Sequence, residues 1–390
     1  MAAALVAAGC EQQDTIVAAQ RSRRPLDPAL VARGQEIFRH STFGNEAFWT
    51  DTARMHEVIA SAVSPAVALA VGLQVDAEAL PQSLKDALAA GQVDLNDPAT
   101  TIALLKLNAV VGLHGTVERA GGRDTLVAVG ITCALCHSRV DNSFAPGIGS
   151  RLDGWAATDL NVGAIVALSP AIADPLKAVL RSWGPGRYDP RINQDGLNTP
   201  IRIPPAYGLR HVAKETYTAE GPVSYWNAYV AVTQMHGQGN FKDARLGIDV
   251  RADSDLVTPQ LGALAEYQFS LETPPAPRAA DGAAVRRGRA VFNGPAQCSS
   301  CHIPGLQFSD VNLGRLHLAE ETGVDGAYAA RTATRRYRTT PLRGLWQHAP
   351  YFHDGSAATL EDVVAHYNRV RDLRLSAQQQ ADLAAYLKTL

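Results

Sequence analysis

The feature that most constrains this chain is a five-residue pattern, Cys-x-x-Cys-His, that occurs twice. Its residues are Cys133, Cys136 and His137 in CALCH, and Cys298, Cys301 and His302 in CSSCH. Two thiols on one helical turn can each form a thioether with a haem vinyl group, and the histidine that follows then faces the iron as its ligand. A zinc site would use all four cysteines and would not need a histidine after each pair. We therefore expect two covalently bound haem c groups.

Helix-like segments flank both motifs. DPALVARGQEIFRHSTF and DGAAVRRGRAVFNGPAQ open the two regions, and LVTPQLGALAEYQFSL and LSAQQQADLAAYLKTL close them. Each closing segment has residues at i, i+3 and i+7, which lie on one face of a helix. These residues are Leu264, Tyr267 and Leu271 in the first copy, and Leu383, Tyr386 and Leu390 in the second. The repeat is typical of cytochrome c domains, in which a closing helix packs across an opening helix.

The repeats predict a mainly α fold class with two cytochrome c-type domains, long ordered loops and one haem per domain. The chain has 32 Gly and 22 Pro residues, and strand signals are sparse. The Pro-rich stretch ETPPAPRAADG, 272–282, is the expected linker, so we expect domains at 28–275 and 276–390. The first domain contains a long insert, 45–128, with the helix-like stretches LPQSLKDALAAG and ATTIALLKLNAVVGL.

The composition and the N-terminus bear on location and partners. A formal net charge of −2 gives no basic field for nucleic acid. No apolar run reaches the roughly 18 residues that span a bilayer. Residues 1–27 are the expected leader and tether. The stretch MAAALVAAGC resembles the end of a bacterial lipoprotein signal, but it lacks the basic region that export signals carry. Cys10 is thus either a lipid anchor of an exported, periplasmic protein or a stray thiol.

The chain resembles the bacterial diheme cytochrome c peroxidases and the related diheme enzyme that matures tryptophan tryptophylquinone. The resemblance is specific at both CxxCH motifs and at two further stretches, GWAATDLN and TTPLRGLWQHAPYFHDGSAATLEDVVAHYN. The resemblance covers most of 28–390 but not the insert. It implies that the N-terminal haem is the peroxide site and that the C-terminal haem relays electrons to it from a small redox protein. It also implies a calcium ion bound by the Asn161 side chain and the carbonyls of His348 and Pro350, ligands that suit a hard cation. The alternative role for Asn161 is a helix cap.

A tyrosine lies where the resemblance places an iron ligand. Thr359 and Asp362 form an expected capping box, and Tyr367 falls on the apolar face of the helix that follows. From the pattern alone, Tyr367 is a core tyrosine. The peroxidases have a methionine fourteen residues after the histidine of FHDG, here His353, and the quinone-maturing enzyme has a tyrosine there. Tyr367 is therefore the expected ligand of the second iron, and a phenolate favours ferric and higher states. His366 is a rival ligand off the apolar face.

The resemblance implies an open coordination position at the first iron. Many of the peroxidases carry a distal histidine two residues before a tryptophan, here Trp155, and that position is Asp153 in this chain. Met235 and His236 are alternative sixth ligands.

The acid–base and relay residues also come from the resemblance. A glutamate and a glutamine over the iron would move a proton between the peroxide oxygens. We expect these to be Glu220, with Glu215 as an alternative, and Gln194. Trp183 corresponds to a tryptophan that relays electrons between the haems. The simpler alternatives are a solvated loop carboxylate and an ordinary core tryptophan.

Three functions follow from these expectations. The first is an exported diheme peroxidase that reduces hydrogen peroxide with electrons from a small redox protein. This function is compatible with a homo-oligomer. The second is a diheme oxidase or oxygenase that acts on a protein or organic substrate through high-valent iron. The third is a non-catalytic electron-transfer cytochrome, which requires strong ligands on both sides of both irons. The missing distal histidine argues against the third.

Overall fold

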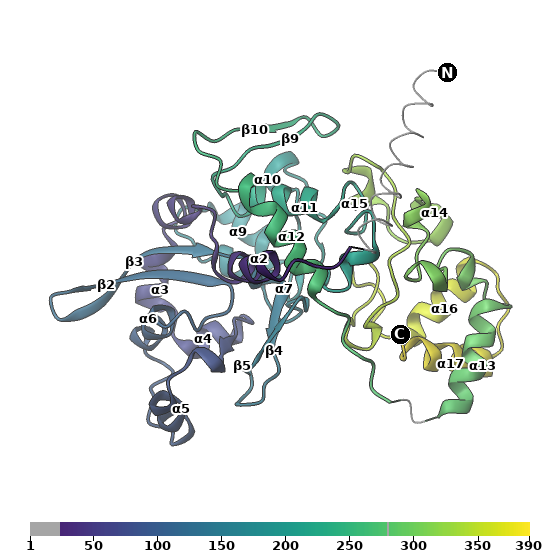
Figure 1. Ribbon diagram of the computed structural model, residues 1–390, viewed down its shortest axis with the longest axis horizontal. Helices are drawn as coiled ribbons and strands as arrows, with labels where there is room; N and C mark the ends of the chain where they lie inside the picture. The colour runs from purple at the N-terminus through teal and green to yellow at the C-terminus, as the bar shows by residue number, and fades with distance from the viewer. Residues whose placement is uncertain (1–23, 279–280) are drawn as a thin grey trace. The chain divides into compact units, whose positions relative to one another are not determined.

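The computed structural model describes residues 24–278 and 281–390, which form two compact units (Figure 1). The N-terminal unit comprises Asp27–Tyr207 and Asn227–Tyr267. The C-terminal unit comprises 24–26, Gly208–Trp226 and Gln268–Leu390. Cys10 lies outside the described residues, and the domain limits given above stay a prediction.

Helices dominate the secondary structure, which confirms the mainly α class. The first group is α2 (Pro28–His40), α3 (Met55–Ala62), α4 (Pro65–Ala70), α5 (Gln82–Ala89), α6 (Pro98–Lys106), α7 (Ala134–His137), α8 (Val162–Val166), α9 (Asp174–Arg181) and α10 (Ile192–Asp195). The second group is α11 (Val223–Tyr229), α12 (Leu261–Ser270), α13 (Gly282–Asn293), α14 (Ala319–Thr322), α15 (Ala327–Ala330), α16 (Leu360–Val370) and α17 (Ala377–Leu387). Within the part of the chain that the structure describes, no helix has the length and apolar character needed to cross a membrane.

Shorter helical turns connect these elements. Two are π-helical, Ala47–Thr52 and Val230–Gln234. The 3₁₀ turns are Ala77–Ala79, Leu209–His211, Thr258–Gln260, Cys298–Ser300, Pro304–Leu306, Val311–Leu313 and Leu345–Gln347.

The described strands form five two-stranded sheets. The parallel pair is β1 (Val75–Asp76) with β5 (Ile148–Gly149). The antiparallel pairs are β2 (Leu113–Ala120) with β3 (Arg123–Ile131), β4 (Ser138–Val140) with β6 (Arg151–Asp153), β7 (Arg187–Tyr188) with β8 (Ile201–Arg202), and β9 (Phe241–Asp243) with β10 (Ile248–Val250). Most of these strands are too short to form a core, so they connect helices rather than support them.

The opening helix of the N-terminal unit packs closely against α12. A Cβ atom at Gly34 would lie 2.0 Å from the carbonyl oxygen of Ala263 and 2.6 Å from Cβ of Tyr267, so this crossing requires a glycine. Phe38 is fully buried, and its ring meets the Tyr267 ring edge-on at 5.5 Å between centroids. The predicted crossing of opening and closing helices is confirmed here.

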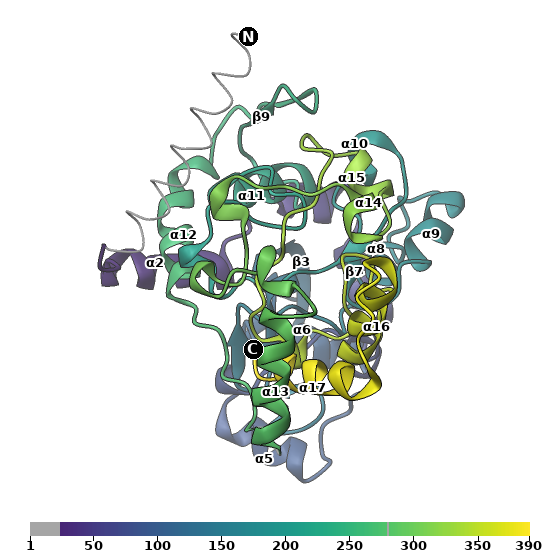
Figure 2. The same ribbon diagram turned by 90° about the vertical axis from the view of Figure 1, so that its right-hand side faces the viewer.

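The C-terminal unit repeats this crossing with α13 and α17, which lie side by side in Figure 2. A Cβ atom at Gly288 would lie 1.9 Å from the carbonyl oxygen of Asp382 and 2.8 Å from Cβ of Tyr386. The rings of Phe292 and Tyr386 meet edge-on at 5.4 Å. Each unit therefore closes through the same glycine, phenylalanine and tyrosine arrangement.

The insert 45–128 shares an apolar core with residues that follow it, including Ile148 and Leu160, and adds a hairpin. The two helix-like stretches predicted there are α5 and α6, and α6 contributes the buried Leu104 and Leu105. The strands β2 and β3 project from the unit in Figure 1. They are joined by Gly121 and Gly122 with φ values of 57° and 82°, which is the left-handed region that a tight hairpin turn requires. Because β3 ends at Ile131, the hairpin leads directly into the first CxxCH motif.

Candidate functional site

The first CxxCH motif forms one short helical turn, α7. Neither Cys133 nor Cys136 is in a disulfide, and burial raises the pKa of each thiol to about 12. The Nδ1–H of His137 donates to the carbonyl oxygen of Pro204 at 3.0 Å, which leaves Nε2 without the proton. Burial lowers the pKa of His137 to about 4, so the ring is neutral. A neutral imidazole whose other nitrogen is tied to a carbonyl is the usual proximal ligand of a haem iron.

The second CxxCH motif shows the same chemistry on a 3₁₀ turn. Burial raises the pKa of the Cys298 thiol to about 11 and lowers the pKa of His302. The Nδ1–H of His302 donates to the carbonyl oxygen of Phe308 at 2.9 Å, and Nε2 is left for a metal. The residues present at both motifs thus fit covalently bound haem.

Tyr367 lies beside the second motif. Its helix, α16, begins with the predicted capping box: the amide of Asp362 donates to Oγ1 of Thr359 at 3.1 Å, and the amide of Thr359 donates to Oδ2 of Asp362 at 2.9 Å. Burial, together with the charges of Cys298 and Cys301, raises the pKa of Tyr367 to about 12. The phenol therefore lies within electrostatic range of both cysteines of the motif.

The rival ligand His366 is engaged elsewhere. Its Nε2–H donates to the carbonyl oxygen of Thr322 at 2.8 Å, and its ring packs against Phe352 at 4.8 Å between centroids. Of the two neighbouring candidates, Tyr367 is therefore the better placed for the second iron. Its coordination of that iron stays a prediction.

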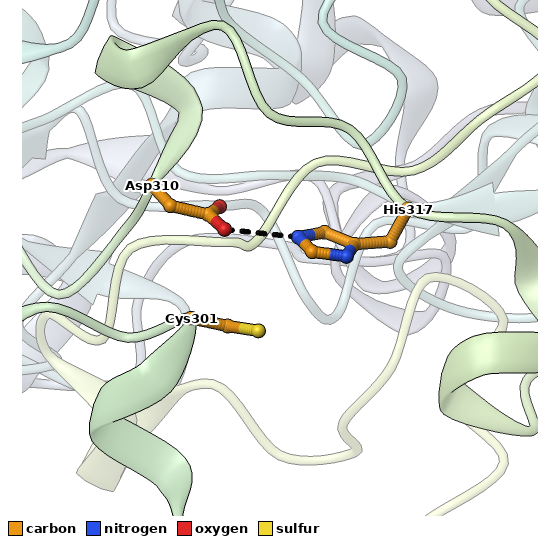
Figure 3. A group of neighbouring side chains, drawn as sticks. All are labelled: Cys301, Asp310 and His317. Carbon is orange, nitrogen blue, oxygen red and sulfur yellow. Dashed lines mark hydrogen bonds and ion pairs between the residues drawn. The ribbon is translucent and has the colours of Figure 1, made fainter.

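A cluster of three potential ligand residues near the second motif was not predicted from the sequence. Asp310, His317 and Cys301 place their ligand atoms within 4.8 Å of one another, and Figure 3 shows the carboxylate and the ring pointing toward each other. Nε2 of His317 lies 3.0 Å from Oδ2 of Asp310, and Nδ1 lies 3.2 Å from a carboxylate oxygen of Glu321. The hydrogen bond to Asp310 raises the pKa of His317. Because Cys301 would carry a thioether, we interpret the group as an ion pair beside the haem rather than a metal site.

Comparisons with known proteins support the two-haem assignment. The chain is 30% identical over 151 residues to methylamine utilization protein MauG of Methylorubrum extorquens, which covers 33% of this chain and 42% of MauG. It is 32% identical over 174 residues to cytochrome-c peroxidase IdrP2 of a Pseudomonas species, covering 33% of this chain and 47% of IdrP2. Over about a third of its length, the chain is homologous to diheme cytochrome c peroxidase and MauG proteins. It spans less than half the length of these two relatives.

Two further comparisons are more limited. The family model described as RoxA-like, cytochrome c-like matches residues 336–373, which include the FHDG turn and Tyr367. A solved MauG-like protein associated with microbial copper homeostasis aligns with a TM-score of 0.36 and 23% identity, over 51% of this chain and 75% of that chain.

Asp153 joins three segments around the first CxxCH motif. Oδ1 accepts a hydrogen bond from Ser138, next to His137, at 2.6 Å. Oδ2 accepts from the Tyr267 hydroxyl at 2.6 Å and from Nε of Arg39 at 2.5 Å. The residue at the position of a distal histidine therefore ties the opening helix, the closing helix and the CxxCH segment together.

We predict that Asp153→Asn destabilises the protein and changes its acid sensitivity. Burial opposes ionisation of Asp153, but the hydrogen bonds from Ser138 and Tyr267 and the charges of Arg151 and Arg39 outweigh it, so the pKa is lowered. A lowered folded pKa stabilises the protein above the unfolded value near 4, and the benefit is lost as pH falls through the folded pKa. The variant should lose about 3 kcal/mol of unfolding free energy at neutral pH and less below about pH 4.

Urea unfolding from about pH 3 to about pH 7 measures this difference. Asp124→Asn is the matched control, because Asp124 on β3 pairs with Lys106 of α6 at the surface, at 2.7 Å, and an exposed pair should contribute much less. Equal losses in the two variants would show that Asp153 is not a buried brace.

The alternative sixth ligands pack against the insert. Met235 is buried, and its carbonyl oxygen accepts a hydrogen bond from Nε1 of Trp49 at 3.0 Å. The His236 ring stacks on the Phe48 ring at 3.6 Å between centroids. These contacts give both residues a packing role, and ligation of the first iron by either stays a prediction.

The expected acid–base and relay residues fall in both units. In the N-terminal unit, Trp183 is buried and donates from Nε1 to Oδ1 of Asn198 at 2.7 Å, and Gln194 accepts from the Tyr229 hydroxyl at 3.4 Å. In the C-terminal unit, the buried Glu220 accepts hydrogen bonds from the Ala333 amide at 2.8 Å and the Thr218 hydroxyl at 3.2 Å. The alternative of a solvated carboxylate is wrong for Glu220, but the catalytic roles stay predictions. The same holds for Glu215, which is buried and paired with Arg338 at 2.9 Å.

The structure gives the positions of the expected calcium ligands but does not test calcium binding. Oδ1 of Asn161 accepts a hydrogen bond from the Ala164 amide at 3.0 Å, which confirms the helix-cap alternative for this residue. The turn with His348 and Pro350 lies in the C-terminal unit, and the Ala349–Pro350 peptide is cis. A capping amide oxygen retains a second lone pair. Calcium binding stays a prediction.

Proposed function

We propose that this protein is a periplasmic diheme c-type peroxidase that reduces hydrogen peroxide, with electrons supplied by a small redox protein. One observation carries the proposal. Each CxxCH histidine has Nδ1 tied to a carbonyl and Nε2 available, but the charges of the second motif's cysteines act on the phenol of Tyr367, whereas the carboxylate of Asp153 is bonded to Ser138 beside the first motif. The two sites thus have different ligand environments, and a catalytic iron paired with an electron-transfer iron requires such a difference.

Each of the site residues has a separate proposed role. Haem c held by His137 and by His302 supplies the electron-transfer chemistry. The carbonyl that accepts from Nδ1 makes each imidazole a stronger and better oriented ligand. Glu220 and Gln194 are proposed to transfer a proton between the two peroxide oxygens, and Trp183 is proposed to relay electrons. Two of the relatives are named cytochrome-c peroxidases, which supports peroxide as the proposed substrate.

A second function has specific support. The curated relatives include MauG as well as peroxidases, and Tyr367 is a phenol where an electron-transfer haem would carry a thioether. A phenolate ligand stabilises oxidised iron, which suits the storage of oxidising equivalents. Oxidation of a protein or organic substrate is therefore the second candidate.

Three measurements on the exported protein test the proposal. Mass spectrometry should show two haem additions per chain. Electron paramagnetic resonance of the resting ferric protein should show a high-spin signal from one haem. Peroxide consumption with a reduced small redox protein should exceed that without it. Low-spin signals from both haems and no peroxide consumption would favour the non-catalytic cytochrome.

We also predict that a calcium chelator lowers peroxidase activity. Asn161 and the carbonyls of His348 and Pro350 are the proposed ligands, and removal of the ion should weaken electron transfer between the haems. The activity should return when calcium is added but not when magnesium is added, because magnesium requires a smaller octahedral site. Metal analysis that finds no calcium in active protein would contradict the prediction.

A further inference from the structure

A buried tyrosine and a buried histidine of the C-terminal unit form a pair that the proposed function does not use. The Tyr337 hydroxyl lies 3.0 Å from Nε2 of His353, and the two rings are tilted against each other with centroids 4.6 Å apart. The side chains are only 6% and 5% exposed. The hydroxyl donates to the carbonyl oxygen of Asp325 at 2.8 Å and accepts from the Ala329 amide at 3.3 Å. When His353 carries its own proton on Nδ1, its Nε2 is a second acceptor for the phenol proton, within hydrogen-bonding distance.

The charges around the pair favour proton transfer over ionisation of the phenol. Burial raises the pKa of Tyr337, and the Asp325 and Asp354 carboxylates raise it further, so phenolate is disfavoured. Burial lowers the pKa of His353, but the same two carboxylates oppose that effect. Negative charge nearby stabilises an imidazolium and destabilises a phenolate. If Tyr337 loses an electron, its proton therefore has a favourable destination on His353.

Two short paths connect the pair to the second haem motif. The backbones of Tyr337 and His317 exchange hydrogen bonds of 2.7 and 2.8 Å, and a ring nitrogen of His317 lies within 4.8 Å of the Cys301 sulfur. On the other side, His353 follows Phe352, whose ring lies 5.9 Å from the Tyr367 ring. The pair is thus linked to a haem attachment point and to the proposed iron ligand.

We propose that Tyr337 and His353 form a redox-active site that supplies one electron to the oxidised haem centre. Hydrogen peroxide takes up two electrons and two protons to give two molecules of water. One electron comes from haem iron and one from Tyr337, and both protons come from solvent. As Tyr337 loses its electron, its O–H bond breaks and the proton bonds to Nε2 of His353, which leaves a neutral tyrosyl radical and an imidazolium. Two electrons from the redox donor then restore the haem iron and the phenol, and the proton returns from Nε2 to the phenol oxygen. Peroxide as the oxidant rests on the proposed function.

The experiment is electron paramagnetic resonance of the two-haem protein, frozen after one equivalent of peroxide. We expect an organic radical whose hyperfine pattern changes when the protein contains ring-deuterated tyrosine, a label that leaves the fold unaltered. Tyr337→Phe should lose this signal and keep both haem spectra. His353→Gln should form the radical on the order of 100-fold more slowly, because it lacks the proton acceptor. Tyr217→Phe is the matched control, since its ring lies 6.3 Å from the same imidazole, and it should keep the signal.

A second oxidant separates failure of this inference from failure of the proposed function. A flash-generated ruthenium(III) polypyridyl complex oxidises the protein without peroxide and should give the same Tyr337-dependent radical. If peroxide leaves the wild-type haem spectra unchanged but the flash gives the radical, the peroxidase proposal is wrong and the redox site is supported. If peroxide alters the haem spectra and either oxidant gives an undiminished radical in Tyr337→Phe, the inference is overturned.

Discussion

Replacing His137 by alanine should abolish peroxide consumption, whereas replacing His302 should leave peroxide binding at the first haem and stop electron delivery to it. The two imidazoles are equivalent in their hydrogen bonding, but they belong to motifs with different surroundings. Loss of a residue that only orients a metal ligand costs about 10- to 100-fold, so loss of the ligand itself should cost more than about 100-fold. Stopped-flow spectra after peroxide addition report binding, and steady-state turnover with a reduced donor reports delivery.

Glycine variants at the same positions sharpen this test. Imidazole added to His137→Gly should restore part of the peroxide reaction if the position supplies only a ligand. His114→Ala, a substitution on β2, is the control and should retain turnover. Peroxide binding that survives in His137→Ala and disappears in His302→Ala would reverse the assignment of the two haems.

Tyr367→Met should raise the reduction potential of the second haem by on the order of 0.1 V or more, because a thioether stabilises reduced iron and a phenolate stabilises oxidised iron. The half-reduced protein should then be easier to obtain. Tyr367→Phe removes the ligand atom and keeps the ring, so it should give an open or water-ligated iron with an altered visible spectrum. Spectroelectrochemical titration measures both effects.

Tyr386→Phe is the matched control for these variants. It makes the same change on α17, where the ring packs against Phe292, and it should alter stability without moving the haem potential. If Tyr367→Phe leaves both spectrum and potential unchanged, Tyr367 is a core residue. Met235 and His366 would then be the next ligands to test.

The sequence predicted what depends on short spacing. The CxxCH turns, the capping box at Thr359 and the placement of Tyr367 on the inner face of α16 all follow from residues a few positions apart. The closing helices were also predictable, because their apolar repeat is local. The Gly34 and Gly288 crossings have the same kind of local signal in the matching stretches RGQEIF and RGRAVF.

Groups that depend on distant residues were not predicted. Arg39 and Tyr267 are each 114 residues from Asp153, so no spacing rule connects the three. The Tyr337–His353 and Asp310–His317 pairs likewise form only when long loops fold. The hairpin β2–β3 was missed for another reason: its strands carry many polar, exposed residues, and only the Gly121–Gly122 turn marked it.

The repeated helix crossing implies an order of assembly in time. In the C-terminal unit, the Arg287–Asp382 pair joins residues 95 positions apart, whereas in the N-terminal unit the Asp27 amide bonds to Glu266 across 239 positions. The longer loop adds less than about 1 kcal/mol of closure entropy, because that entropy grows only with the logarithm of length. Folding rate is more sensitive, since contacts between distant residues form slowly and domains of a long chain fold as units. We therefore expect the C-terminal unit to close first during refolding and the N-terminal unit to remain open longest.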